Sequence, residues 1–123
     1  MAVYVVKLRD NRFYVGYTSD FRKRLNQHLK GKSSEWVKKF KLASNPVYKI
    51  YETEEKIDEL FHFIEMVKIF GVQNVRGAQF SAIKLSEKSI STIKILETYE
   101  DLRLVICEKC GLRGHDKSIC ENK

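Results

Sequence analysis

Four side chains near the end of the sequence have the types and spacing of a metal site. Cys107, Cys110, His115 and Cys120 follow the pattern Cys-x2-Cys-x4-His-x4-Cys and include every cysteine of the 123-residue chain. Three thiolates and one imidazole suit a tetrahedral structural Zn²⁺ site. Because an odd number of cysteines confined to one tail does not suit a disulfide framework, we expect zinc here.

The same segment resembles the CCHC zinc knuckle of retroviral nucleocapsid and related proteins. Gly111 and Gly114 stand between the ligands, where tight turns around an ion favour glycine. Knuckles of this kind commonly bind unpaired nucleic acid. Leu112 and Arg113 occupy the middle of the motif, where an aromatic stacking residue is missing, so a protein partner is the alternative for this segment.

A second set of residues, in the N-terminal third, resembles the GIY-YIG nuclease family. Ala2-Val3-Tyr4 stands where the family has Gly-Ile-Tyr, and Tyr14-Val15-Gly16 is a form of Tyr-Ile-Gly. Arg24 lies ten residues after Tyr14, where the family has an arginine, and His28 lies four residues further on, where many members have histidine or tyrosine.

This resemblance covers roughly residues 2–75, and the stretch 14–28 is similar to the branch that includes structure-specific repair nucleases. It implies an endonuclease dependent on Mg²⁺ or Mn²⁺ that hydrolyses phosphodiester bonds of nucleic acid. DNA is the expected substrate, in a branched, nicked or partly single-stranded form. The reaction needs a deprotonated water, a cation near the developing negative charge and a route for the leaving oxygen.

The resemblance also implies a role for each side chain. Tyr14 is expected to act as general base or to help activate water, with Tyr4 in support. Arg24 offers a planar fork for two phosphate oxygens, and His28 assists proton transfer or positioning. One carboxylate could hold Mg²⁺ while water and the substrate phosphate complete its octahedron.

Two glutamates of the longest helical pattern compete for the metal. Glu59 falls on the apolar stripe that faces the domain body, whereas Glu65 lies nearer the flank. Family members with an aromatic-Gly-x-x-Asn-Val-Arg-Gly segment place their glutamate well upstream of it, and residues 70–77 look like that segment. Both observations favour Glu59, with Glu65 as the alternative. Asn74 resembles an asparagine that some members use to orient the site.

The two tyrosines can share one site only if the loop between their strands has an odd length. Side chains alternate between the two faces of a strand, so residues of equal parity must pair for Tyr4 and Tyr14 to face the same side. Residues 9–11, Arg-Asp-Asn, are a turn signal, and Asn11 can adopt a left-handed conformation. We therefore expect a three-residue turn.

The elements that must position these residues follow from periodicity and turn signals. The expected strands are residues 3–8, 12–18 and 46–51. The expected helices are one capped by Ser19 or Asp20 and closed by Gly31, a short one carrying Trp36 to Phe40, a long one opened by residues 53–55 and ended by Gly71, and one over residues 86–100. They predict an α/β (α+β) domain, residues 1–100, with a small three-stranded, largely antiparallel sheet flanked by helices, followed by the knuckle at 104–123.

The net charge of +7, from 23 Lys and Arg against 16 Asp and Glu, favours a polyanionic partner. No apolar run approaches the roughly 20 residues of a membrane span, and the N-terminus lacks the pattern of a signal peptide. We therefore expect no membrane partner and an intracellular, reducing compartment, cytoplasm or nucleus. A virus or a mobile element is one conceivable source of such a nuclease.

The rival hypothesis is a catalytically inactive module of the same fold that binds nucleic acid or protein. Ala2 replaces the glycine of the first signature, and Tyr17 stands where some relatives carry lysine. Cleavage that depends on Mg²⁺ distinguishes the enzyme from the module.

Overall fold

The computed structural model describes residues 1–101 and residue 103. The predicted knuckle at 104–123, with the zinc ligands Cys107, Cys110, His115 and Cys120, lies outside the described residues.

A four-stranded sheet with the strand order β3-β1-β2-β4 forms the centre of the fold. β1 (Ala2–Leu8) pairs antiparallel with both β2 (Arg12–Thr18) and β3 (Leu42–Glu52), and β4 (Val75–Gly77) pairs parallel with β2. The prediction of three strands was wrong. β4 has only three residues and its partner strand lies far upstream, so local alternation in the sequence does not reveal it.

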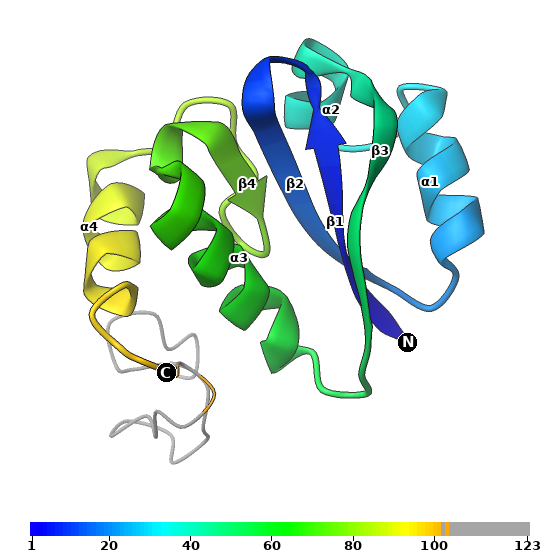
Figure 1. Ribbon diagram of the computed structural model, residues 1–123. Helices are drawn as coiled ribbons and strands as arrows, with labels where there is room; N and C mark the ends of the chain where they lie inside the picture. Colours follow the sequence, from blue (N-terminus) through cyan, green and yellow to red (C-terminus); the bar gives the residue numbers. More distant parts are fainter. Residues whose placement is uncertain (102, 104–123) are drawn as a thin grey trace.

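Helices cover both faces of this sheet, as Figure 1 shows. α1 (Phe21–Leu29) and α2 (Glu35–Phe40) lie on one face, whereas α3 (Ile57–Phe70) and α4 (Glu87–Leu96) lie on the other. No helix among the described residues is long and apolar enough to cross a membrane. The observed architecture is therefore a mixed α+β domain, as expected.

Capping side chains fix where three of the helices begin. Asp20 Oδ1 accepts a hydrogen bond from the Lys23 backbone N–H at 3.1 Å, and Ser34 and Ser86 cap α2 and α4 in the same way. Each cap satisfies an N–H group that a helix leaves unpaired and contributes about 1 kcal/mol. The structure thus selects Asp20 rather than Ser19, which sets the register of the α1 side chains described below.

Alternation along β1 and β2 separates two clusters of buried side chains. Odd-numbered residues, such as Val5 and Phe13, pack with α3 and α4 in the larger apolar core. Even-numbered residues, including Tyr4 and Tyr14, pack against α1 and α2 in a smaller cluster that contains Trp36, a residue predicted to be core. The two tyrosines therefore point to the same face of the sheet.

β3 is an edge strand and begins at Leu42, earlier than the predicted 46–51. Pro46 lies within it, and the pairing with β1 is irregular between Val5 and Leu8. An edge tolerates proline because one side of the strand has no partner for an N–H group. This explains why the strand extends past a residue that usually ends one.

Candidate active site

The β1–β2 hairpin brings both signature tyrosines to one face. It pairs Tyr4 with Gly16 and Val6 with Tyr14, so every pair joins residues of equal parity across the three-residue turn Arg9–Asn11. The predicted odd-length loop is confirmed. Asp10 and Asn11 have φ values of 61° and 55°, a left-handed conformation that Asp and Asn tolerate better than most residues.

Gly16 leaves room for the ring of Tyr4 on the neighbouring strand. A Cβ atom at position 16 would lie 2.3 Å from both Cζ and Oη of Tyr4. Real Cβ atoms do not approach other atoms so closely, so any other residue would displace the ring. The glycine of the second signature is therefore needed for the tyrosine of the first.

Tyr4 joins two side chains of α1 in a chain of hydrogen bonds. Arg24 Nε donates to Tyr4 Oη at 3.3 Å, and Tyr4 Oη lies 2.7 Å from His28 Nε2. Because Arg24 can only donate, the Tyr4 proton is available for His28 Nε2, and His28 Nδ1–H then donates to Ser33 Oγ. The spacing of four residues puts Arg24 and His28 on one face of α1, one turn apart.

The buried fractions of these side chains separate those that can meet a ligand from those that support them. Tyr4 is 1% exposed and His28 is 3% exposed, whereas Tyr14 is 8% exposed and Arg24 is partly exposed. The Tyr14 ring centroid lies 6.4 Å from that of Tyr4 and 5.5 Å from that of His28. Arg24 is thus the member of the cluster that reaches the surface, and Tyr14 is buried but slightly more exposed than Tyr4 and His28.

The protonation states follow from burial. Burial raises the pKa of Tyr4 and the pKa of Tyr14, and Arg24 lowers both. Burial, and then Arg24, lowers the pKa of His28 to about 4. At neutral pH both phenols keep their protons and the imidazole is neutral. A phenolate at Tyr14 would need positive charge in addition to Arg24.

Glu59 brings a carboxylate to this cluster from the first turn of α3. Its charge raises the pKa values of Tyr4 and Tyr14, so it lies within electrostatic reach of both. Burial raises the pKa of Glu59 itself, and Lys56 lowers it. Across residues 1–101 and 103, the Glu59 carboxylate makes no hydrogen bond or ion pair. Its oxygens are therefore open to a cation.

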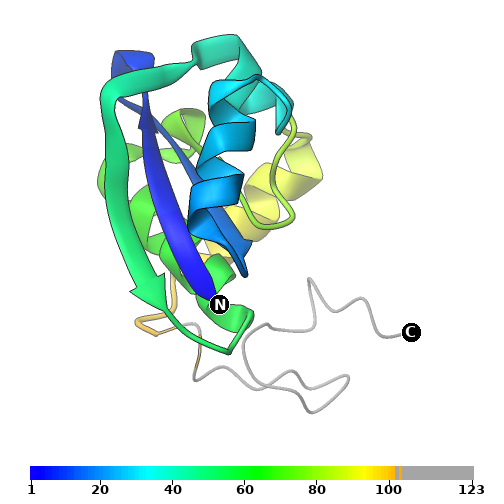
Figure 2. The same ribbon diagram turned by 90° about the vertical axis from the view of Figure 1, so that its right-hand side faces the viewer.

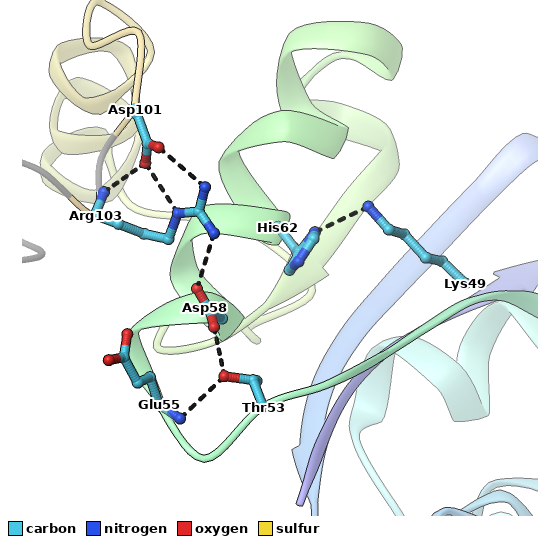
Figure 3. Close-up of polar contacts among 7 residues, drawn as sticks. All are labelled: Lys49, Thr53, Glu55, Asp58, His62, Asp101 and Arg103. Atoms are coloured by element: carbon cyan, nitrogen blue, oxygen red, sulfur yellow. Dashed lines mark hydrogen bonds and ion pairs between the residues drawn. The ribbon is translucent and has the colours of Figure 1, made fainter.

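Contacts of the adjacent Asp58 hold the turn that leads into α3. Thr53 Oγ1 donates to Asp58 Oδ2 at 2.6 Å, and Arg103 Nη1 lies 3.5 Å from Asp58 Oδ1 (Figure 3). Arg103 also pairs with Asp101 at 3.0 Å. These bonds tie the end of β3 and the segment after α4 to the first turn of α3, so they fix the backbone that carries Glu59.

Two other residues singled out from the sequence lie away from the cluster. Glu65 pairs with Lys68 at 3.3 Å on the flank of α3. Asn74 Nδ2 donates to the Phe70 carbonyl at 2.8 Å, so it closes the C-terminal end of the helix. Glu59 stands near the other end of this helix, eleven residues and roughly 16 Å before Phe70 along the axis, and the role of Asn74 in orienting the site stays a prediction.

An open groove of about 390 Å³ begins at Arg24. Its lining residues are Met1, Tyr17, Thr18, Ser19, Asp20, Lys23, Arg24 and Gln27. Gln27 Oε1 accepts from Arg24 Nη1 at 2.9 Å and orients the guanidinium. The sequence contained a signal for this pair, since residues three apart are neighbours on a helix. Nothing in the sequence signalled that Ser33 is the partner of His28.

The donor set around Glu59 fits one Mg²⁺ ion. In the part of the chain that the structure describes, no three His, Cys, Asp or Glu side chains gather where they could hold a metal. Mg²⁺ commonly takes one or two carboxylates and completes its shell with water and substrate phosphate. A half-buried carboxylate with no hydrogen bond or ion pair to the described residues, within electrostatic reach of Tyr17 in the groove, suits that mode.

Comparison with known proteins gives the family. The model of the GIY-YIG catalytic domain matches residues 1–65. This match covers more than half of the chain, and the chain belongs to the GIY-YIG family. The family is one of endonucleases, and the matched residues include the β1–β2 hairpin, α1, α2, β3 and the first part of α3.

Similar proteins occur in two bacteria. The UPF0213 protein YazA of Bacillus subtilis is 49% identical over 35 residues, which are 28% of this chain and 35% of that protein. The UPF0213 protein spr1390 of Streptococcus pneumoniae is 41% identical over 49 residues, 40% of this chain and 46% of that protein. This chain thus spans less than half of these curated relatives, whose names state no activity. No solved structure matches the chain.

Proposed function

We propose that this protein is a metal-dependent endonuclease that hydrolyses phosphodiester bonds of nucleic acid. The observation that carries the proposal is the cluster of Tyr4, Tyr14 and Arg24, with Glu59 within electrostatic reach of both phenols. Arg24 is hydrogen-bonded to the Tyr4 that packs beside Tyr14, and the charge of Glu59 acts on both phenols. Tyr14 lies on β2, Arg24 on α1 and Glu59 on α3, so only the packing of the fold could bring these side chains to one substrate.

Each side chain then has a task that its surroundings permit. The Arg24 guanidinium binds two oxygens of the scissile phosphate and stabilises the negative charge that develops there. Tyr14 can take the proton of the attacking water only as a phenolate, after its own proton has passed to solvent; Arg24, together with a bound cation, would favour that phenolate. Tyr4 and His28 are almost fully buried and hydrogen-bonded to each other, so their role at the scissile phosphate is to hold Arg24 in place. Mg²⁺ or Mn²⁺ on Glu59, when bound, would polarise the phosphate and lower the pKa of nearby water.

DNA is the proposed substrate, with branched, nicked or partly single-stranded forms favoured. The zinc-binding pattern of Cys107, Cys110, His115 and Cys120 supports this choice, because knuckles of that kind bind unpaired strands. We place the protein inside the cell, where a reducing environment keeps thiols available for zinc. A protein partner for the knuckle remains the alternative role of that segment.

Cleavage assays on matched glutamate variants test the proposal. Nicked, flapped, duplex and single-stranded DNA would be incubated with the parent protein in Mg²⁺ and in EDTA. Glu59→Gln should lower the rate constant by at least about a hundredfold while DNA affinity stays within a few fold, since the loss of an interaction made in the transition state lowers kcat. Glu65→Gln is the control, with the same change of charge on the same helix but outside the cluster, and should cleave like the parent.

The raised pKa values of both tyrosines favour the rival, a module that binds without cutting. Tight, salt-sensitive binding of DNA with no Mg²⁺-dependent cleavage of any substrate would select it. Cleavage by Glu59→Gln at the rate of the parent would instead show that the metal assignment is wrong. RNA versions of the same substrates decide between the two nucleic acids.

A further inference from the structure

The excess positive charge of the protein is concentrated in α1, α2 and the segment between them. Residues 22–41 contain eight Lys or Arg and one acidic residue, a net charge of +7. This equals the net charge of the whole chain, so the charges of all other residues cancel. Figure 2 shows α1 and α2 together on one side of the molecule. The basic residues are Arg22, Lys23, Arg24, Lys30, Lys32, Lys38, Lys39 and Lys41.

A pocket of about 420 Å³ lies within this region, at the C-terminal end of α1. Its lining residues are His28, Leu29, Lys30, Gly31, Val37, Lys38, Lys41 and Leu42. Lys38 pairs with Glu35 at 3.3 Å on the surface. Lys30 and Lys41 have no carboxylate partner among the residues that the structure describes. The pocket therefore carries uncompensated positive charge, which suits an anion.

Lys41, at the end of α2, has a strained backbone conformation. Lys41 has φ 60° and ψ 152°, a region adopted almost only by glycine. Its N–H donates to Val37 O at 2.8 Å and its carbonyl accepts from Arg9 N–H at 3.0 Å, so both sides of the residue are held. Glycine would take this conformation with less strain. Lys41 therefore combines a backbone conformation that costs stability with a side chain that lines the pocket.

His28 connects this pocket to the candidate active site. Its ring lines the pocket, and its Nε2 atom bonds Tyr4. Arg24 and Lys30 lie six residues apart on α1, a rise of roughly 9 Å. For a stacked strand, whose charges recur every 3.4 Å along its axis, an axial rise of this size spans about two to three nucleotides. Leu29, which is 63% exposed, adds an apolar wall beside the lysines for a sugar or a base.

We propose that this pocket binds a backbone phosphate of the substrate strand, two to three nucleotides away from the phosphodiester that is cut. The inference rests on the proposed function, because Arg24 must hold the scissile phosphate for the spacing to apply. A strand bound in this way runs along α1, from the groove at Arg24 to the lysines between α1 and α2. The pocket then sets a minimum length of substrate on one side of the cut.

Binding measured without cleavage tests the inference separately from catalysis. Fluorescein-labelled single-stranded oligothymidylates of increasing length would be titrated in EDTA at several salt concentrations. For long strands, the double variant Lys30→Ala/Lys41→Ala should lower the slope of log affinity against log salt by about 0.7 for each lysine removed. Strands too short to reach from Arg24 to the pocket should show no difference from the parent.

The matched control is Lys88→Ala/Lys94→Ala, which removes two exposed lysines of α4 on the other face of the sheet. A parental slope in the Lys30/Lys41 variant, or the same loss as in the α4 control, would overturn the inference. A loss of affinity that is the same for strands of every length would also overturn the inference. So would a pocket that binds inorganic phosphate while the affinity of the Lys30/Lys41 variant for long strands equals that of the parent, because the pocket would then be a site for free phosphate.

Lys41→Gly separates the side chain from the backbone. This variant should melt at the same or a higher temperature than the parent, yet bind long strands more weakly. Parental affinity in Lys41→Gly would contradict a role for the lysine in binding. If the parent never cuts DNA but the slopes change as described, the nuclease proposal fails and the pocket stands. If it cuts but the slopes stay unchanged, only the pocket fails.

Discussion

The two faces of the sheet are built on different principles. On the face that α3 and α4 cover, odd-numbered strand residues meet helices in a large apolar core, with side chains such as Phe63 and Ile64 fully buried. On the face that α1 and α2 cover, the buried side chains include Tyr4 and His28, which are held by hydrogen bonds, and the surface above them is strongly basic. β1 and β2 contribute side chains to both faces.

The difference indicates that stability and chemistry are divided between the faces. Apolar packing on the α3 side is non-directional and contributes most of the folding free energy. Directed bonds on the α1 side contribute little net stability but hold Arg24 in one geometry. Glu59 is the link between the two, since it stands on α3 and acts electrostatically on Tyr4 and Tyr14.

A pair of truncations would separate the faces most strongly. Phe63→Ala removes a ring that is 0% exposed in the apolar core and should lower the free energy of unfolding by about 3–5 kcal/mol. Tyr14→Phe removes one phenol oxygen on the other face of the sheet and should cost about 1 kcal/mol or less, while it lowers the rate of DNA cleavage by a hundredfold or more. Urea unfolding and cleavage rates measure the two effects. Comparable losses of stability would contradict the division.

The two buried histidines, one on each face, give a pH-dependent test. Burial lowers the pKa of His28 and of His62 from 6.5 to about 4, with Arg24 the next cause for His28 and Lys49 for His62. The folded protein therefore favours the neutral form of both imidazoles. The stabilisation is complete above pH 6.5 and is lost as the pH falls toward 4, by up to about 3 kcal/mol for each histidine.

Urea unfolding across this pH range in single variants would assign the two contributions. His28→Gln and His62→Gln should each remove the contribution of one histidine to the loss of unfolding free energy between pH 6.5 and 4. Only His28→Gln should also lower the cleavage rate, because it breaks the bond to Tyr4, whereas His62 contacts Lys49 and Tyr51 outside the site. Stability that does not change between pH 6.5 and 4 would argue against neutral buried imidazoles.

The smallest expected effect concerns the link between the faces. Arg103→Ala removes the ion pair to Asp58, whose side chain is only 5% exposed, and should destabilise the fold by about 1 kcal/mol. Because the first turn of α3 loosens, half-maximal cleavage should need more Mg²⁺. Arg103→Lys keeps the charge and should lie between the parent and Arg103→Ala. An unchanged Mg²⁺ requirement in Arg103→Ala would show that Glu59 is positioned without this contact.

Features that depend on local sequence were predictable. The three-residue turn followed from the turn signal Arg9–Asn11 and the requirement that the tyrosines share a face. The placement of Glu59 toward the domain body followed from helical periodicity, which reports the buried face of α3. Local patterns are sufficient there because alternation and the helical repeat are properties of short segments.

Features that depend on distant parts of the chain were not predictable. β4 forms because residues 75–77 meet β2, and no local pattern announces that meeting. The bond from His28 to Tyr4 joins residues 24 positions apart, and the near-complete burial of Tyr4 depends on Phe21 of α1 packing over it. Asn74 was assigned by likeness to a motif, but its amide bonds the end of its own helix.

The turn between β1 and β2 has a consequence for how the sequence can change. Adding or deleting a single residue within Arg9–Asn11 would reverse the parity of the pairing. Tyr14 would then point into the apolar core beside α3, and Phe13 and Val15 would point toward Arg24 on the other face. Natural or engineered changes in the length of this turn should therefore come in steps of two residues, because only an odd length keeps both tyrosines on the face of α1.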